Sequence, residues 1–419
     1  MDRNSAGGDT FPSDRRSAVL KTVNFAAAAF IAICSSACAQ TAAERGRYLA
    51  VLGDCEGCHA SPGGKSLAGG QPLISPFGKL YSSNITPDRT TGIGNWSAED
   101  FYRAMHSGIR PDGAHLYPAF PFAYFTHLGH ADTDALYAYL RGQPPVRQAQ
   151  PPDALAFPFN IRSLMTFWDA LFLDTSPIRP DAKQSAAWNR GRFIVEGPGH
   201  CAECHTPKNA LFGDKTGEAL RGESVDHWFA ADLTGTQRGG LGLWTAQDIA
   251  AFLKTGVTGR ATAIGPMQDV VAKSTSRMSD VDRSAIAAYL KSLPPHNMAI
   301  PAAPAAAEMQ AGHDIFVEHC SVCHQGSARL DIGGFPLLPN NTLVQGRNPV
   351  TVLRLILGGS QSVALAGTKT SYSMPSFAAL SDGEIASVAT FIRNAWGNRA
   401  SPVKPQDVST LRAAIAASP

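Results

Sequence analysis

The chain has 419 residues, of which 44% are apolar and 17% charged, and its formal net charge is +2. This length suits two or three domains of ordinary size. The charge is close to neutral and the sequence has no basic stripe or long run of like charges, which argues against a nucleic-acid partner.

Residues 1–39 are predicted to be an export signal peptide and no part of the fold. A basic stretch at residues 15–21 precedes the apolar run NFAAAAFIAIC, and Ala37 and Ala39 give the small-x-small pattern of a cleavage site. The apolar run is short for a membrane span, which needs about 20 residues. We expect cleavage after Ala39 and a periplasmic mature chain; an uncleaved anchor or a lipid on Cys38 are the alternatives.

Six of the eight cysteines remain after this cleavage, and all six belong to three copies of one pattern, C-x-x-C-H. This pattern is typical of c-type haem attachment. Two thiols on one helical turn can bond the two vinyl groups of a haem, and the next histidine supplies the proximal iron ligand. The sequence therefore predicts three covalent haem c (heme c) groups. The three copies are Cys55, Cys58 and His59; Cys201, Cys204 and His205; and Cys320, Cys323 and His324.

Two other uses of C-x-x-C are disfavoured. A structural zinc site needs four ligands in one place, whereas these pairs lie more than a hundred residues apart and each has its own histidine. A thioredoxin-like redox pair needs a βαβ setting, and no parallel-strand pattern surrounds any copy.

Each copy belongs to a longer repeat. A glycine-containing helix precedes the cysteines, a polar loop follows them, and then come a middle helix and a closing helix. The closing helices are predicted to begin at Ser279 and Ser381, each followed three positions later by an acidic residue that can complete a capping box. The predicted caps of the middle helices are Ser97 and Gly108, Thr245 and Gly256, and Asn348 with Pro349 at the first helical position.

The predicted fold class is all-α, with little strand and three tandem cytochrome c-like helical domains. The expected boundaries are domain 1 at 40–150, domain 2 at 184–297 and domain 3 at 308–398. An aromatic linker at 151–183, a Pro/Ala linker at 298–307 and a short tail at 399–419 complete the chain. Within 151–183, an apolar stripe predicts an amphipathic helix that packs on its own protein or docks a partner subunit or a membrane surface. The stripe consists of Leu164, Phe167, Trp168, Leu171 and Phe172.

Methionine sulfur usually fills the sixth iron position in cytochromes c. Met267 and Met374 stand at matching places in the second and third repeats, 62 and 50 residues after the histidine. Met278 ranks second to Met267 because it begins the closing helix. These positions predict Met267 and Met374 as distal iron ligands.

The first repeat has Phe120 at this place, in the stretch HLYPAFPF, and phenylalanine cannot bind iron. Met105 lies on the middle helix and is expected in the core. Either the first iron lacks a protein ligand in its sixth position, or a histidine takes it. The candidates are His106, His115, His127 and His130.

From about residue 43 to 398 the sequence resembles the three-haem cytochrome c subunits of bacterial membrane-associated dehydrogenases. The resemblance is carried by GGQPLISPFGKLYSSNITPD, GIGNWSAEDFYRAMHSGIRPDG, LYPAFPF, AAYLKSLPP and LSDGEIASVATFIRNAWGN. Members of this family serve quinoprotein alcohol dehydrogenases, flavin-dependent sugar-acid and sugar dehydrogenases, and molybdenum hydroxylases. Phe120 stands where the alcohol group has methionine, which makes this sequence more similar to the molybdenum-hydroxylase group.

The resemblance implies an electron-transfer subunit, with no catalytic residues of its own, that takes electrons from a catalytic dehydrogenase subunit toward quinone or a terminal oxidase. Its expected location is the periplasm, with peripheral contact to the inner membrane as an option. The alternative is a peroxidase-like haem enzyme that uses an open position above His59, although the sequence shows no distal acid–base pair.

Overall fold

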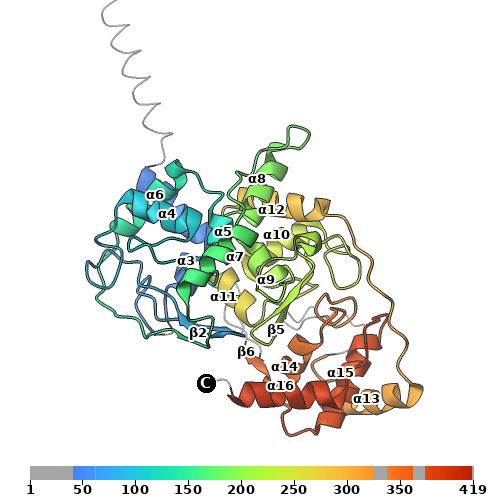
Figure 1. Cartoon of the computed structure of the whole chain (residues 1–419). Coiled ribbons are helices and arrows are strands. Elements are labelled where there is room, and N and C mark those ends of the chain that lie inside the picture. The colour runs from blue at the N-terminus through green and yellow to red at the C-terminus, as the bar shows by residue number, and fades with distance from the viewer. Residues whose placement is uncertain (1–40, 62, 325–336, 362–372, 418–419) are drawn as a thin grey trace, which may run out of the picture.

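The computed structural model describes residues 41–61, 63–324, 337–361 and 373–417 (Figure 1). The signal peptide expected at residues 1–39 lies outside them. Helices joined by long loops dominate the described residues, so the predicted helix-rich architecture is confirmed. The strands are short antiparallel pairs, in keeping with the expectation of little strand.

The first part of the described chain places a strand hairpin between its first and later helices. β1 and β2 form this hairpin, and β3 pairs with the free edge of β2. The elements are α2 (Ala42–Leu52), α3 (Cys55–Cys58), β1 (Pro72–Ser75), β2 (Gly78–Tyr81), α4 (Ala98–Ser107), α5 (Phe122–Phe125), α6 (His130–Arg141) and β3 (Ala154–Leu155).

A short linker helix and a second set of helices follow. The linker holds the 3-10 turn η1 (Arg162–Leu164) and α7 (Met165–Phe172), so the predicted amphipathic helix is present. The second set is α8 (Ala186–Glu196), α9 (Cys201–His205), η2 (Thr216–Glu218), β4 (Glu223–Val225), β5 (Trp228–Ala230), α10 (Ala246–Thr255), α11 (Pro266–Lys273), η3 (Thr275–Arg277) and α12 (Asp280–Ser292).

The last part contains four helices of the described residues, one of which, α16, lies at the C-terminal end. Where the sequence predicts only a short tail, α16 packs on α14 and α15 and buries Val408 and Leu411. The elements are α13 (Ala306–His319), α14 (Val350–Gly358), β6 (Ser360–Gln361), β7 (Ser373–Met374), α15 (Asp382–Asn394) and α16 (Pro405–Ala417).

Two of the three predicted middle-helix caps are confirmed. Ser97 and Thr245 each form a capping box with the aspartate three positions on, and Gly108 and Gly256 end these helices at positive φ. The third prediction is wrong by one residue. Helix α14 starts at Val350, so Pro349 is its N-cap and not its first helical residue. The Asn348 side chain still accepts a hydrogen bond from the Val350 N–H, at 2.9 Å.

Each C-x-x-C-H pattern follows a helix that packs closely on a closing helix: α2 on α6, α8 on α12 and α13 on α15. A glycine lies at every one of these three crossings. A Cβ atom at that glycine would collide with a backbone carbonyl oxygen of the partner helix, so only glycine permits the close approach. The glycines and the residues they meet are Gly46 with Ala135, Gly191 with Ala285, and Gly312 with Ser387.

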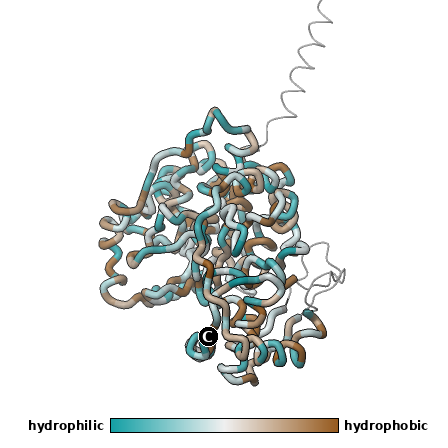
Figure 2. Tube along the Cα trace, turned by 90° about the vertical axis from the view of Figure 1, so that its right-hand side faces the viewer, coloured by the Kyte–Doolittle hydropathy of each residue, from teal (hydrophilic) through white to brown (hydrophobic). Residues whose placement is uncertain are grey.

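The first two sets of helices share one apolar core, in which Leu52 and Leu136 belong to the same cluster as Ile194 and Ile286. The third set has a separate cluster around Ile385. Figure 2 shows hydrophobic and hydrophilic residues alternating along the chain throughout the body. Among the described residues, no helix is both long enough and apolar enough to cross a membrane.

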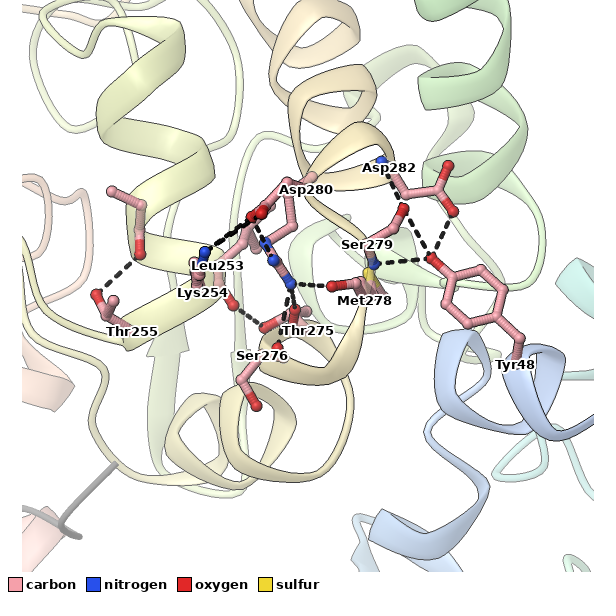
Figure 3. Close-up of polar contacts among 12 residues, drawn as sticks. Tyr48, Leu253, Lys254, Thr255, Thr275, Ser276, Met278, Ser279, Asp280 and Asp282 are labelled. Carbon is pink, nitrogen blue, oxygen red and sulfur yellow. Dashed lines mark hydrogen bonds and ion pairs between the residues drawn. The ribbon is translucent and has the colours of Figure 1, made fainter. Parts of the chain in front are cut away.

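Polar contacts join the first and second parts beside this shared core (Figure 3). The Tyr48 hydroxyl donates to the Asp282 carboxylate at 2.7 Å and accepts from the Ser279 N–H at 3.0 Å. Arg190 donates to both oxygens of Asp282, each at 2.8 Å. The capping box predicted at Ser279 is therefore only half formed, because the Asp282 carboxylate binds Tyr48 and Arg190 and not the Ser279 N–H.

The glycine crossings generate the first prediction. We expect Gly46→Ala and Gly191→Ala each to lower the free energy of unfolding by about 1–3 kcal/mol, because the added methyl group forces the helices apart. Gly383→Ala is the matched control: it is exposed in the first turn of α15 with nothing near its missing Cβ, and should be neutral or stabilising by up to about 1 kcal/mol. Denaturant unfolding of the three variants measures this. Equal behaviour of all three would contradict the role of the crossings.

Asp282 generates a second prediction. Burial acts to raise its pKa, but the hydrogen bonds from Arg190 and Tyr48 and the charge of Arg190 lower the pKa overall. We expect Asp282→Asn to lower the free energy of unfolding at pH 7 by about 1–2 kcal/mol, a modest value because the Arg190 side chain is 38% exposed.

The lowered pKa of Asp282 determines how its contribution to stability depends on pH. A carboxyl group whose folded-state pKa is lowered stabilises the fold above its unfolded pKa of about 4, and this stabilisation is lost as the pH falls through the folded pKa. The gap between wild type and Asp282→Asn should therefore shrink as the pH is taken from 7 to below 4. Asp134→Asn, at an exposed position of α6, is the control and should show no gap at either pH. A gap for Asp282→Asn that persists in acid would contradict the account.

Candidate haem-attachment sites

The first two C-x-x-C-H patterns begin at the same backbone turn. A residue with positive φ stands directly before the first cysteine, Asp54 at 45° and His200 at 35°. The chain turns there out of α2 or α8 and into the short helix that carries the two cysteines. The close helix crossings at Gly46 and Gly191 thus fix where each pair of thiols lies.

The histidine that ends each of these patterns is oriented by a backbone carbonyl. The Nδ1–H of His59 donates to Ser83 O at 2.7 Å, and that of His205 donates to Ala231 O at 2.6 Å. Burial lowers the pKa of both rings, although these hydrogen bonds oppose the shift. Each imidazole is therefore held neutral with its Nε2 lone pair available, as an axial iron ligand requires.

The loops around these two histidines match in further detail. In each loop, the histidine carbonyl accepts a hydrogen bond from a glycine N–H at 2.8 Å, and a leucine carbonyl accepts one from an aliphatic residue further along the loop. The donor–acceptor pairs are Gly69 with His59, Gly222 with His205, Ile85 with Leu67, and Leu233 with Leu220. The same site is thus built twice.

The third pattern is placed in part. Helix α13 ends at His319, and the His324 N–H donates to Cys320 O at 2.9 Å, which continues the turn through the cysteines. Burial lowers the pKa of His324 as it does for the other two histidines. The loop that follows, residues 325–336, lies outside the described residues.

The cysteines fit covalent attachment of an apolar macrocycle. All six cysteines of the described chain are free thiols. Burial raises the pKa of Cys55 to about 12 and that of Cys201 and Cys320 to about 11, so the thiols are neutral in largely apolar surroundings. Within the described residues, no three His, Cys, Asp or Glu side chains converge on a point that suits a metal ion.

The structure brings the first and second patterns together. The pKa of Cys58 is raised to about 11 by burial, by Asp54 and also by Glu203, a residue of the second pattern. The His200 ring lies 3.2 Å from Gly53 O, and the Ser274 hydroxyl donates to Val51 O at 2.6 Å. Two C-x-x-C-H patterns far apart in sequence therefore meet at one interface.

The expected distal methionines lie in different settings. Met267, the second residue of α11, packs in a small cluster with Phe252 and Val271. Met374 is the last residue of β7 and packs against the separate apolar cluster around Ile385. Met278 and Met105 are both 5% exposed within the shared core, so Met105 is a core residue as expected and Met278 has a packing role. Residues 362–372, which lead to Met374, lie outside the described residues.

Phe120 also packs against the shared core. Its ring stacks on Phe125 with centroids 5.5 Å apart, and Phe125 in turn meets His200 edge-on at 5.6 Å. This aromatic row runs from the place of the missing methionine to the start of the second C-x-x-C-H pattern.

The four histidines considered in place of that methionine have other contacts. Both ring nitrogens of His115 are engaged, Nδ1 with Asp169 at 2.8 Å and Nε2 with Thr166 at 3.2 Å. His127 Nδ1–H donates to Ser176 O at 2.9 Å. The remaining two, His106 and His130, both stack on Tyr102.

Sequence reasoning missed Ser83 and Ala231, which orient the two histidines. Their side chains carry no signal, because the backbone carbonyl makes the contact. The only available clue was the spacing: these carbonyls lie 24 and 26 residues after their histidines, at matching places in the repeat.

Comparison with known proteins gives a consistent result. Residues 309–396 match the cytochrome c family model. The chain is 37% identical to the gluconate 2-dehydrogenase cytochrome c subunit of Pantoea cypripedii, over 94% of this chain and 93% of the relative. It is also 37% identical to the cytochrome c subunit of the quinone-dependent alcohol dehydrogenase of Gluconacetobacter polyoxogenes, over 93% and 89%. Identity to a nicotinate dehydrogenase subunit of Pseudomonas putida is 42% over 84% of this chain, which spans only 30% of that relative.

The setting of Phe120 generates a third prediction. Carbon monoxide binds a ferrous haem whose sixth position is open, so about one haem in three of the reduced wild-type protein should bind it. Phe120→Met should abolish this binding and raise the midpoint potential of one haem, since a methionine ligand favours the ferrous state. A carbon monoxide difference spectrum and a potentiometric titration measure the two effects.

The control for this prediction is His115→Ala, which should leave carbon monoxide binding unchanged because both His115 nitrogens are engaged elsewhere. Wild-type protein that binds no carbon monoxide would show that a side chain already fills the position.

Proposed function

The chain belongs to the family of dehydrogenase cytochrome c subunits, and we propose that it is the electron-transfer subunit that accepts electrons from a catalytic dehydrogenase subunit. One observation carries this proposal: two histidines that follow paired cysteines are each oriented by a backbone carbonyl and kept neutral by burial, at sites that lie side by side. A bound haem c supplies one-electron chemistry at its iron.

We assign three haem c groups to this chain, one to each C-x-x-C-H pattern. The three glycine helix crossings support three cytochrome c units with the boundaries 40–150, 184–297 and 308–398. In each unit two cysteines would hold the macrocycle, and His59, His205 or His324 would bind the iron. Met267 and Met374 would complete the second and third sites, whereas Phe120 leaves the first site without a methionine ligand.

The second unit contacts both of the others, which supports a central place in the electron path. It meets the first through Asp282 and Tyr48. It meets the third through the Phe229 N–H, which donates to the Thr351 hydroxyl at 2.7 Å, and through the Trp244 indole, which donates to Thr342 at 3.0 Å. Electrons would pass between the outer units through the second one.

Two observations bear on the class of the dehydrogenase partner. Phe120 and the likeness to a nicotinate dehydrogenase subunit favour a molybdenum hydroxylase over a quinoprotein or a flavoprotein partner. The expected signal peptide supports a periplasmic location, and quinone or a terminal oxidase would be the acceptor. Several relatives are named as cytochrome subunits of dehydrogenases, and nothing favours the peroxidase alternative.

A fourth prediction tests the electron path. In the native complex, Cys201→Ala combined with Cys204→Ala should lower the haem content from three to two per chain. Electron delivery from substrate to a quinone acceptor should fall at least tenfold, because the central unit is interrupted. Substrate oxidation with a soluble dye that draws electrons from the catalytic subunit should persist, and dithionite should still reduce the two remaining haems.

Undiminished electron delivery in this variant would contradict a central second unit. If the isolated wild-type chain oxidised a substrate with peroxide at an enzymatic rate, the proposed function itself would be wrong.

A further inference from the structure

The linker between the first two units exposes an unusual concentration of apolar side chains. Among the described residues, thirteen large apolar side chains are exposed; six of them fall within residues 157–171, and a seventh, Leu211, lies on a loop that contacts this stretch. The most exposed of these seven are Phe157 (79%), Phe167 (68%) and Leu171 (67%). A concentration of this kind on a folded protein marks an interaction site. We call the exposed side chains of residues 157–171, together with Leu211, the linker face.

The backbone under the linker face is firmly held. The Trp168 indole N–H donates to Leu211 O at 2.9 Å, and the Tyr117 hydroxyl donates to Phe159 O at 2.8 Å. Asp169 on the inner side of α7 lies 2.8 Å from His115. The linker is therefore fixed to the protein while its apolar side chains point outward, so little order would have to be gained on binding.

The linker face also lies beside the segment that contains Phe120 and beside the loop that follows His205. Trp168 meets Phe122 edge-on at 6.0 Å, two residues after Phe120. Leu211 belongs to the loop that directly follows His205. Figure 1 shows α7 next to α5, the helix that begins at Phe122. A protein bound here would stand close to the first and second attachment sites.

The charges on the linker face indicate which kind of partner fits. Helix α7 carries a single charged residue, Asp169, which is paired with His115. The one cation of the adjoining turn, Arg162, is bound to Asp153 at 2.5 Å and donates to His115 O at 3.0 Å. An in-plane membrane helix typically adds cations that attract anionic lipid, whereas the centre of a protein interface is aromatic, apolar and poor in charge. The linker face matches the protein interface.

From these observations, and resting on the proposed function, we propose that the linker face is the docking surface for the catalytic dehydrogenase subunit. Relatives of this chain carry names that make them subunits of dehydrogenases, so a catalytic partner is expected. Electrons would enter the chain at this face, beside Phe120 and the loop that follows His205.

The test compares two doubly substituted full-length chains, haem-loaded and tagged, made in the native host without its own copy of the gene. Phe167→Asp with Leu171→Asp places two carboxylates on the linker face. Val281→Asp with Ile300→Asp is the matched control, because these residues are equally apolar and are 76% and 75% exposed elsewhere. Each preparation is assayed for haem content, reduction by dithionite, and the amount of co-purifying subunit that carries a flavin, quinone or molybdenum cofactor.

We expect the linker-face variant to retain at least tenfold less of this subunit per haem than wild type, with an unchanged haem spectrum, and the control to match wild type. A photo-crosslinking residue at position 167 should then join that same subunit, identified by peptide sequencing, whereas the residue at position 281 should not.

Other outcomes overturn the proposal. If the linker-face variant keeps the catalytic subunit, the docking surface is wrong while the proposed function stands. If this variant instead loses binding to phosphatidylethanolamine–phosphatidylglycerol vesicles, the linker face is a lipid-binding surface. If it loses self-association, the face is a contact between copies of this chain. In both cases the docking proposal is wrong while the proposed function stands. If tagged wild-type chain brings down no cofactor-bearing subunit and its haems are not reduced by any dehydrogenase substrate of the host, the proposed function fails as well.

Discussion

The close packing of two helices at a glycine is the contact on which the placement of each C-x-x-C-H pattern depends. At Gly46, Gly191 and Gly312 the backbone of one helix touches a carbonyl of its partner. The cysteines begin within five residues of the end of the first helix of each pair, so this crossing sets the position of the thiols. In the first two patterns this crossing also determines the position of the histidine. A backbone carbonyl accepts a hydrogen bond from its Nδ1–H and so fixes the orientation of the ring, which leaves Nε2 available to an iron atom.

The sequence predicts the chemistry of this protein better than its assembly. The C-x-x-C-H patterns, the glycine helices and the caps at Ser97 and Thr245 are local signals, and the structure contains the helices and caps they indicate. The shared core of the first two parts could not be predicted, because the same apolar stripe would suit an isolated domain or a joint one. Helix α16 was missed because its apolar residues, such as Val408 and Leu411, are too few to distinguish a packed helix from a tail.

The candidate site shows the same division. Side-chain types predict the cysteines and histidines of the three C-x-x-C-H patterns as the attachment residues, and they single out Phe120 as the exception. They could not identify Ser83 and Ala231, which act through the backbone, nor the engagement of His115 by Asp169 and Thr166. The contacts of His115 explain physically why this histidine is not available as an iron ligand. The structure also separates the residues of the linker stripe into two groups. The Trp168 indole donates a hydrogen bond to the Leu211 carbonyl, whereas the side chains of Phe167 and Leu171 are exposed to solvent.

The central claim is that the three C-x-x-C-H patterns each hold one covalent haem. The most direct measurement is the intact mass of the protein purified from its native host, recorded under denaturing conditions that strip any haem not bonded to cysteine. The account predicts the mass of the processed polypeptide plus three haems, and a loss of one haem for each cysteine pair replaced by alanine. A mass with fewer than three haems in fully loaded wild-type protein would contradict it.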